Sequence, residues 1–303
     1  MTIEEILCDI KSDRVKKVIL DSDMGIELDD QYALAHCIGC DKIDLLSVNA
    51  ETFGIDGDNL AGMNSSYDEI GRVLRVCGKI DDIPFYKGAE ITITKTGETK
   101  PIISDSVHNI IKTVLESDEI VYVLGTGCST NITSAILLEP KIKKNMCVIW
   151  LAGGCLDRAD GTRRECNIEQ DFVSAQLLIN SGVPMAVLPA YDCGTVLIKV
   201  TRDELDEKLP DDTPHEVFFR DTLVEERGDE GFINRECGRV IFDVAAPAAL
   251  SCPDAFDFRI IPAPVITDNG LYAFDSTRHK IIWMYGLDTD KIVEDMFKCI
   301  RNI

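Results

Sequence analysis

The sequence predicts an α/β fold in which helices flank a mostly parallel sheet. Continuous apolar runs at 18–20, 121–124 and 146–151 are typical of parallel strands that are buried on both faces. Each run ends in a loop rich in Gly, Asp or Asn, and the first two loops lead into segments with helical periodicity. The chain of 303 residues has no internal repeat and no Pro/Ser-rich linker, so we expect a single domain over 1–303.

The other expected elements alternate in the same way along the chain. We expect a short helix within 1–16, helices over 63–76, 106–115, 173–180 and 288–300, strands over 43–48 and 183–188, and a terminal hairpin within 260–283. The polar stretch 90–105 is interpreted as a mobile flap. The charged stretch 201–238 has a helical pattern and is interpreted as an excursion outside the sheet, near the mouth of the site.

The charge balance restricts the partners. A net charge of −22 argues against binding nucleic acid or an anionic membrane, because phosphate contacts need clustered Lys and Arg. A neutral small molecule or a cation is more compatible. There is no apolar run of about 18 residues, so we expect no transmembrane helix. The N-terminus starts acidic and lacks the basic region of a signal peptide, which favours the cytoplasm.

The 12 cysteines are scattered and often lie inside apolar runs, so we expect buried, reduced thiols rather than a disulfide framework. Cys37 and Cys40 have CxxC spacing at the end of a helical pattern. A redox or zinc role for this pair finds no support in a second Cys/His pair of the sequence, so buried thiols are the preferred interpretation.

An acidic loop follows the first predicted strand. Residues 21–30 contain five carboxylates, which repel one another, and oxygen ligands on such a loop suit Ca²⁺ or Mg²⁺. Gly25 lets the backbone fold back so that the side chains can converge. The loop also sits where open α/β sheets bind ligands, at the carboxyl end of a strand. The alternative is a structural role, in which Asp29 or Asp30 caps the next helix.

The order Asp21-x-Asp23-x-Gly25 followed by Asp29-Asp30 resembles the signature of the inosine-uridine nucleoside hydrolase family. The family's form is two residues shorter and has Pro where this chain has Met24. The resemblance implies a Rossmann-like nucleoside hydrolase fold. It also implies that Asp23 and Asp30 are metal ligands and that Asp29 contacts the ribose.

Three later segments carry the same resemblance. The turn 125–131 is similar to the family's Gly-x-Leu-Thr-Asn turn, which makes the Thr126 carbonyl a calcium ligand. The run 165–171 resembles Glu-Phe-Asn-x-x-x-Asp, which makes Glu165 and Asn167 ribose contacts, although an N-cap or loop network is the structural alternative. Asp243 matches a further calcium ligand, and Phe242 stands where the family has His, so it is a substrate contact that cannot donate a proton.

The implied function is calcium-dependent hydrolysis of the N-glycosidic bond of ribonucleosides, in nucleoside salvage, by a homodimer or homotetramer. Asp23 would be the general base. The acid for the leaving base stays open among Tyr191, His215, His279 and a water channel, or the preferred substrate has a better leaving group. Base specificity is expected from 90–105 and 201–238. The Asn near the metal stays open among Asn49, Asn59 and Asn64.

Two other functions compete with this interpretation. A calcium-dependent ribose- or nucleoside-binding protein without turnover would also keep the ribose contacts and lack the acid at Phe242. A haloacid-type phosphatase would use Asp21 and Asp23, but Met24-Gly25 break its Asp-x-Asp-x-Thr/Val pattern. His108 is interpreted as a surface residue.

Overall fold

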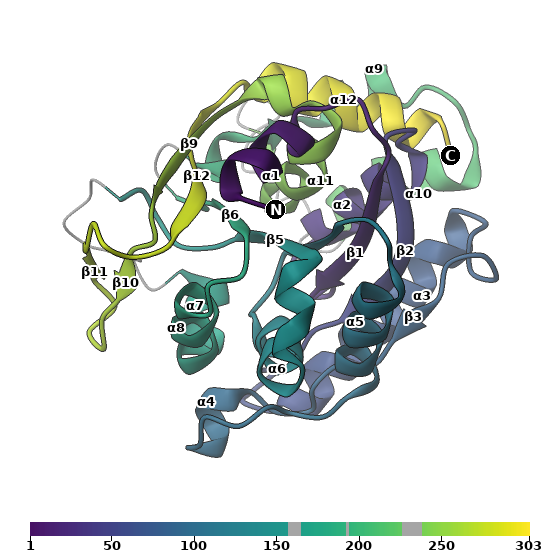
Figure 1. Ribbon diagram of the computed structural model, residues 1–303. Coiled ribbons are helices and arrows are strands. Elements are labelled where there is room, and N and C mark those ends of the chain that lie inside the picture. Colours follow the sequence, from purple (N-terminus) through teal and green to yellow (C-terminus); the bar gives the residue numbers. More distant parts are fainter. Residues whose placement is uncertain (157–164, 192–193, 226–237) are drawn as a thin grey trace.

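The structure is a computed structural model that describes residues 1–156, 165–191, 194–225 and 238–303 (Figure 1). Its centre is an eight-stranded sheet. The strands, in spatial order, are β3 (Phe85–Tyr86), β2 (Ile43–Ala50), β1 (Lys16–Ser22), β4 (Val121–Gly125), β5 (Met146–Leu151), β6 (Met185–Leu188), β12 (Lys280–Leu287) and β9 (Phe256–Pro262). Two small antiparallel pairs lie outside it, β10 (Val265–Ile266) with β11 (Tyr272–Ala273) and β7 (Lys199–Val200) with β8 (Arg239–Val240).

The strand order reverses between β1 and β4. From β1 the chain adds β2 and β3 on one side, whereas β4, β5 and β6 extend the sheet on the other. Neighbouring strands are parallel, except that β9 runs antiparallel to β12. The carboxyl ends of β1 and β4 therefore meet at a topological switch point, which is where open α/β sheets bind ligands.

Helices connect these strands. They are α1 (Ile3–Ile10), α2 (Asp29–Gly39), α3 (Asn59–Val76), α4 (Ile93–Thr96), α5 (Asp105–Glu116), α6 (Thr130–Leu138), α7 (Cys166–Gln170), α8 (Phe172–Asn180), α9 (Arg202–Lys208), α10 (Pro214–Glu225), α11 (Ala245–Ser251) and α12 (Thr289–Arg301). Short 3-10 helices lie at η1 (Pro140–Lys144), η2 (Thr195–Leu197), η4 (Phe242–Val244) and η5 (Pro253–Ala255).

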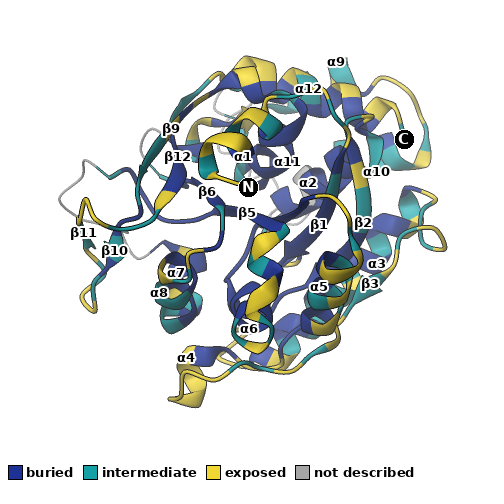
Figure 2. Cartoon of the chain, viewed as in Figure 1, coloured by how far each residue is buried: buried dark blue, intermediate teal, exposed yellow. Residues whose placement is uncertain are grey.

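The two faces of the sheet have separate cores. Alternate residues of one strand point to opposite faces, so Val18 and Leu20 join one cluster while Ile19 joins the other. The first cluster includes α1, α2, α3, α11 and α12, and the second includes α5, α6 and α8. The central strands are consequently buried on both sides (Figure 2). This explains why they appear in the sequence as continuous apolar runs.

The prediction of a mostly parallel sheet flanked by helices is confirmed, and the terminal hairpin is formed by β9 and β12. The stretch 90–105 differs from the predicted mobile flap, because it contains α4 and is held by Asp171. The Asp171 carboxylate accepts hydrogen bonds from the Ile93 and Thr94 amides at 2.8 and 2.9 Å. The helical pattern of 201–238 is confirmed for α9 and α10, and 226–237 lies outside the described residues.

The described cysteines are mostly free, as predicted, but the expectation of buried, reduced thiols is wrong for three of them: Cys8 and Cys166 are exposed, and Cys155 is disulfide-bonded. His108 is exposed on α5, as expected. No helix in the described part of the chain combines the length and the apolar character needed to cross a bilayer.

Candidate functional site

A pocket opens at the switch point, beyond the carboxyl ends of β1 and β4. Its described lining includes all eight site residues predicted from the sequence, namely Asp23, Asp29, Asp30, Thr126, Glu165, Asn167, Phe242 and Asp243. The remaining lining residues are Ile26, Glu27, Leu151, Cys166, Ala190 and Tyr191. Segments that are more than 200 residues apart in the chain thus meet in one pocket because parallel strands end at the same edge of the sheet.

The acidic loop reaches this pocket by folding back after β1. Gly25 has φ +120°, and a Cβ there would lie 2.9 Å from the Ser65 Oγ, so glycine is needed for both conformation and space. The loop is two residues longer than the family signature, because residues 26–28 stand where the signature has a single residue. Two of these three, Ile26 and Glu27, line the pocket. The lining contains no described residue of 90–105 or 201–225, so the expectation that these stretches supply the base contacts finds no support among the described residues.

Neither Asp29 nor Asp30 is the N-cap of α2, which corrects that alternative. Leu28 holds the cap position without a side-chain hydrogen bond, and both aspartates lie in the first turn. Their carboxylates turn toward the pocket instead. The Asp29 Oδ2 accepts from the Asp243 amide at 3.3 Å, and the Asp30 Oδ1 accepts from the Ser22 hydroxyl at 2.6 Å.

Three of these acids converge on one point. Asp29, Asp30 and Asp243 each present a carboxylate oxygen, and the three oxygens lie within 4.8 Å of one another. Asp23 lies in the same pocket and accepts a hydrogen bond from the Gln170 amide at 3.4 Å. All four side chains are buried, with exposed fractions of 5% or less.

Thr126 joins the two halves of the site. Its amide donates to the Asp21 carbonyl at 2.9 Å, and its hydroxyl donates to the Asp30 Oδ1 at 2.8 Å. The Thr126 carbonyl accepts from the Asn167 side-chain amide at 2.8 Å. A carbonyl oxygen has two lone pairs, so one remains for a further partner.

Glu165 and Asn167 take part in an N-cap and loop hydrogen-bond network, which the sequence offered as the structural alternative to ribose binding. Glu165 is the N-cap of α7, and its carboxylate accepts from the amides of Gly153, Asn167 and Ile168. The Asn167 amide donates to the carbonyls of Thr126 and Leu151, which leaves its Oδ1 as an acceptor toward the pocket. Five bonds therefore orient the pair, and the pocket still has access to carboxylate and amide oxygens.

Two aromatic rings line the pocket beside the acids. Phe242 and Tyr191 make an edge-to-face contact with ring centroids 6.4 Å apart. Of the three residues considered as proton donors, Tyr191 lines the pocket, whereas His215 and His279 are not among its described lining residues. His215 contacts Thr213 at the start of α10, and His279 precedes β12.

Sequence reasoning missed one buried acid behind the pocket, Glu51, which lies next to Asp21 of the acidic loop. Burial and then the charge of Asp21 raise the pKa of Glu51, whose two carboxylate oxygens have no hydrogen-bond partner among the described residues, and the Asn131 side-chain amide donates to the Asp21 Oδ1 at 3.0 Å. A Cβ on Gly127 would lie 2.4 Å from the Glu51 Oε2 and 2.7 Å from the Asp23 Cγ, so this glycine lets both acids approach. The position of Glu51 directly after β2 was the signal that could have indicated it.

The three candidate asparagines are also separated by the structure. Asn49 lies opposite Asp21 in the register of β1 and β2, and its Oδ1 accepts from the Asn109 side-chain amide at 3.1 Å. Asn64 accepts from the Lys87 ammonium at 2.8 Å, and the Asn59 carbonyl accepts from the Thr52 hydroxyl. Asn49 is thus the one of the three that is paired in the sheet with an acid of the site, Asp21, although none of them is among the described lining residues.

Burial raises the pKa of every carboxyl group in this cluster. Desolvation is the largest cause for each, and it raises the pKa of Asp21 and Asp30 to about 6 and those of Asp29 and Glu165 to about 7. For Asp23, Glu51 and Asp243, the charges of neighbouring carboxylates add to desolvation, and the pKa rises well above its ordinary value. No Lys, Arg or His is among the described lining residues to offset this.

These donors fit a hard cation. The converging acids and the Thr126 carbonyl offer oxygen ligands, which is the donor set of Ca²⁺ or Mg²⁺, and Cys166 supplies the single thiol among the described lining residues. A divalent ion would offset the mutual repulsion of Asp29, Asp30 and Asp243.

Comparisons with known proteins identify relatives of this chain in sequence and in fold. The family model of the inosine-uridine preferring nucleoside hydrolases matches residues 18–294. The pyrimidine-specific ribonucleoside hydrolase RihB of Escherichia coli O9:H4 is 26% identical over 199 residues, which cover 57% of this chain and 59% of that relative. The match thus spans less than two thirds of its length.

Solved structures share the fold. A purine-preferring ribonucleoside hydrolase from Gardnerella vaginalis superposes with a TM-score of 0.76 at 19% identity and covers 94% of this chain and 98% of its own. A plant nucleoside hydrolase, PpNRh1, superposes with a TM-score of 0.74 at 18% identity and covers 94% and 99%.

The raised pKa values predict that the metal-free protein loses stability as the pH rises. The carboxyl group of Asp29 has a pKa of about 7 in the folded protein and 3.8 in the unfolded chain, so the folded state binds more protons. Its contribution to the free energy of unfolding is therefore full below pH 3.8 and is lost as the pH rises through 7. With chelator present, we expect the melting temperature to fall by about 5 °C or more between pH 5 and pH 7.5.

Calorimetric melting of the wild type, Asp29→Asn and the exposed control Asp118→Asn would measure this. Asp29→Asn should flatten the pH dependence, whereas Asp118→Asn should keep it, because the Asp118 side chain is 90% exposed. A wild-type melting temperature that stays constant or rises over this range would contradict the assignment of raised pKa values.

Proposed function

The chain belongs to the inosine-uridine preferring nucleoside hydrolase family, and from this premise we propose that it hydrolyses the N-glycosidic bond of ribonucleosides with Ca²⁺ as cofactor, releasing ribose and free base. The observation that carries the proposal is the convergence of all eight predicted site residues on one pocket at the switch point of the sheet. We further propose a homodimer or homotetramer that acts in nucleoside salvage in the cytoplasm.

In this proposal Asp23, Asp30, Asp243 and the Thr126 carbonyl hold the ion. Bound calcium would lower the pKa of a ligated water and orient the ribose hydroxyls. The protein prepares for it by holding Asp30 with the Ser22 and Thr126 hydroxyls, so this carboxylate is oriented in advance.

Asp23 is the proposed general base. In the metal-free protein its pKa is raised well above the usual value, first by desolvation and then by the charge of Asp30. The charge of a bound ion would favour the ionised carboxylate, which is the form that accepts a proton from water. Its bond to the Gln170 amide fixes the side chain at the pocket wall. An oxocarbenium-like ribosyl cation formed next to these acids would be stabilised by their negative charge.

The ribose would bind on the opposite wall. Glu165 is oriented by three backbone amides, and its oxygens can still accept hydrogen bonds from ribose hydroxyls. Because the side-chain amide of Asn167 donates both of its protons to backbone carbonyls, its oxygen would accept a hydrogen bond from the sugar. Asp29 would accept from a further hydroxyl.

The leaving base would contact Phe242 and Tyr191. Phe242 offers a ring face or edge for stacking but no proton. Tyr191 packs against it edge-to-face in the same pocket and carries a hydroxyl, so we propose Tyr191 as the residue that supports departure of the base.

Ribose release from a panel of purine and pyrimidine ribonucleosides tests the proposed reaction. We expect release that stops after chelation and returns with Ca²⁺. Asp23→Asn should lower kcat by about 10²- to 10⁴-fold, the usual contribution of a general base. Asp13→Asn is the matched control, because the Asp13 side chain is 99% exposed, and it should keep wild-type activity. Full activity of Asp23→Asn, or of chelated protein, would contradict the proposal.

One observation favours a second function, which is binding without hydrolysis: Phe242 cannot donate a proton to the leaving base. A ribose- or nucleoside-binding protein without turnover would keep the oriented Glu165 and Asn167 and dispense with a proton donor at position 242. Calcium-dependent nucleoside binding by calorimetry, with no ribose released from any member of the panel, would favour this function over hydrolysis.

The role of Tyr191 has its own test. Tyr191→Phe keeps the ring contact with Phe242 and removes the hydroxyl. We expect kcat for natural nucleosides to fall by about tenfold or more, because a general acid contributes about 10²- to 10⁴-fold and water replaces part of it. Hydrolysis of p-nitrophenyl riboside should change little, since its leaving group needs no proton. An equal loss for both substrates would indicate a structural role instead.

A further inference from the structure

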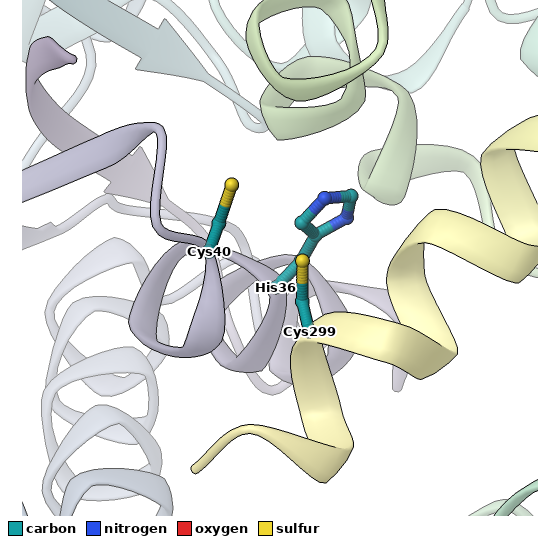
Figure 3. Close-up of side chains that lie close together, drawn as sticks. All are labelled: His36, Cys40 and Cys299. Atoms are coloured by element: carbon teal, nitrogen blue, oxygen red, sulfur yellow. The ribbon is translucent and has the colours of Figure 1, made fainter.

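A second cluster of metal-binding side chains lies at the other end of α2. His36 and Cys40, one helical turn apart, meet Cys299 of α12, and one ligand atom of each lies within 4.8 Å of the others. Figure 3 shows His36 and Cys40 on α2 and Cys299 on the neighbouring α12. Their exposed fractions are 0%, 6% and 3%, so the cluster is closed to solvent.

The imidazole of His36 has an unused nitrogen in this cluster. Its Nε2 lies 2.9 Å from the Ser251 Oγ and 3.0 Å from the Asp295 Oδ2, whereas its buried Nδ1 has no hydrogen-bond partner among the described residues. A buried polar nitrogen without a partner costs free energy, so its orphaned state needs an explanation. A histidine that binds a metal through one nitrogen typically gives the other to a carboxylate, which is the arrangement of Asp295.

The backbone brings the thiols together. A Cβ on Gly39 would lie 1.8 Å from the Cys299 carbonyl oxygen, so α2 and α12 approach as closely as glycine permits. Cys40 follows this glycine at the C-cap of α2. Cys37, the other half of the CxxC pair, is not part of the cluster. The second Cys/His pair that the sequence pattern lacked is thus supplied by His36 and Cys299.

We propose that His36 Nδ1, Cys40 Sγ and Cys299 Sγ bind a zinc ion that joins α2 to α12. Two thiolates and an imidazole are soft-to-borderline ligands that favour Zn²⁺ and disfavour Ca²⁺. Binding releases the two thiol protons to solvent and involves no redox change. One tetrahedral position remains, and Cys252 lies nearby with its thiol hydrogen-bonded to Asp295 and Ser251.

This site is separate from the acidic pocket. The 11 residues of α2 span about 16 Å, with Asp29 and Asp30 at the N-terminus and the cluster at the C-terminus. The clustered ligand atoms also differ, nitrogen and sulfur here and the carboxylate oxygens of Asp29, Asp30 and Asp243 there. The ion would anchor the helix that carries the two aspartates, and the proposal holds whether or not nucleosides are hydrolysed.

Cobalt titration of the reduced, chelator-treated protein tests the proposal. Calcium is kept in excess to occupy the oxygen site. We expect an intense near-ultraviolet thiolate-to-cobalt charge-transfer band that saturates at one equivalent and disappears on addition of Zn²⁺. Carboxylate-bound cobalt gives no such band, and the excess calcium keeps cobalt away from Cys166, the thiol among the described lining residues of the acidic pocket.

Variants identify the ligands. Cys40→Ser and Cys299→Ser should each lose the band or weaken binding at least tenfold, and Asp295→Asn should weaken it about 10- to 100-fold. Cys37→Ser is the matched control, because Cys37 is a buried thiol on the same helix, and it should keep the band. No band in the wild type, or a band unchanged in both Cys40→Ser and Cys299→Ser, would overturn the proposal.

X-ray absorption of the zinc-loaded wild type gives an answer that needs no variant. We expect a first shell with sulfur at about 2.3 Å and nitrogen at about 2.0 Å. A shell of oxygen alone would overturn the site even if the variants fail to fold.

Discussion

The main electrostatic constraint on the structure is the burial of seven carboxyl groups at one edge of the sheet. They belong to Asp21, Asp23, Asp29, Asp30, Glu51, Glu165 and Asp243. Burial raises the pKa of each, and the charges of neighbouring carboxylates raise it further for Asp23, Asp29, Glu51 and Asp243. The described pocket lining contains no Lys, Arg or His. Without a cation the cluster must hold protons or lose stability. With a cation the same oxygens become ligands, and the electrostatic strain is converted into binding free energy.

The fold explains how this density of acids is tolerated. Strands β1 and β4 deliver the acidic loop and Thr126 to one edge, and two hydrophobic cores on the faces of the sheet hold these strands in place. Helix α2 links the pocket to α12, which packs against its other end. Displacement of α2 would move Asp29 and Asp30, so contacts at its C-terminus, including the cluster of His36, Cys40 and Cys299, support the geometry of the pocket.

Much of this arrangement was predictable because it is local in sequence. Continuous apolar runs predicted the central strands, and the acidic loop and Thr126 follow such strands directly. Glu51 was not predicted, because one acid after a strand differs little from an ordinary loop residue until its burial is known. The N-cap role of Glu165 and the meeting of His36 with Cys299, 263 residues away, depend on tertiary packing that no local pattern records. Tertiary packing also explains why Asp29 and Asp30 do not cap α2, because their hydrogen-bond partners Asp243 and Thr126 come from distant segments.

Calcium titration of chelated protein by calorimetry, in buffers with different ionisation enthalpies, tests the central claim most directly. If the carboxyl cluster holds protons that the ion replaces, binding at pH 6 should release about one proton or more, and the release should diminish toward pH 8, above the pKa of about 7 at Asp29. Absence of calcium binding, or binding at pH 6 without proton release, would contradict the account.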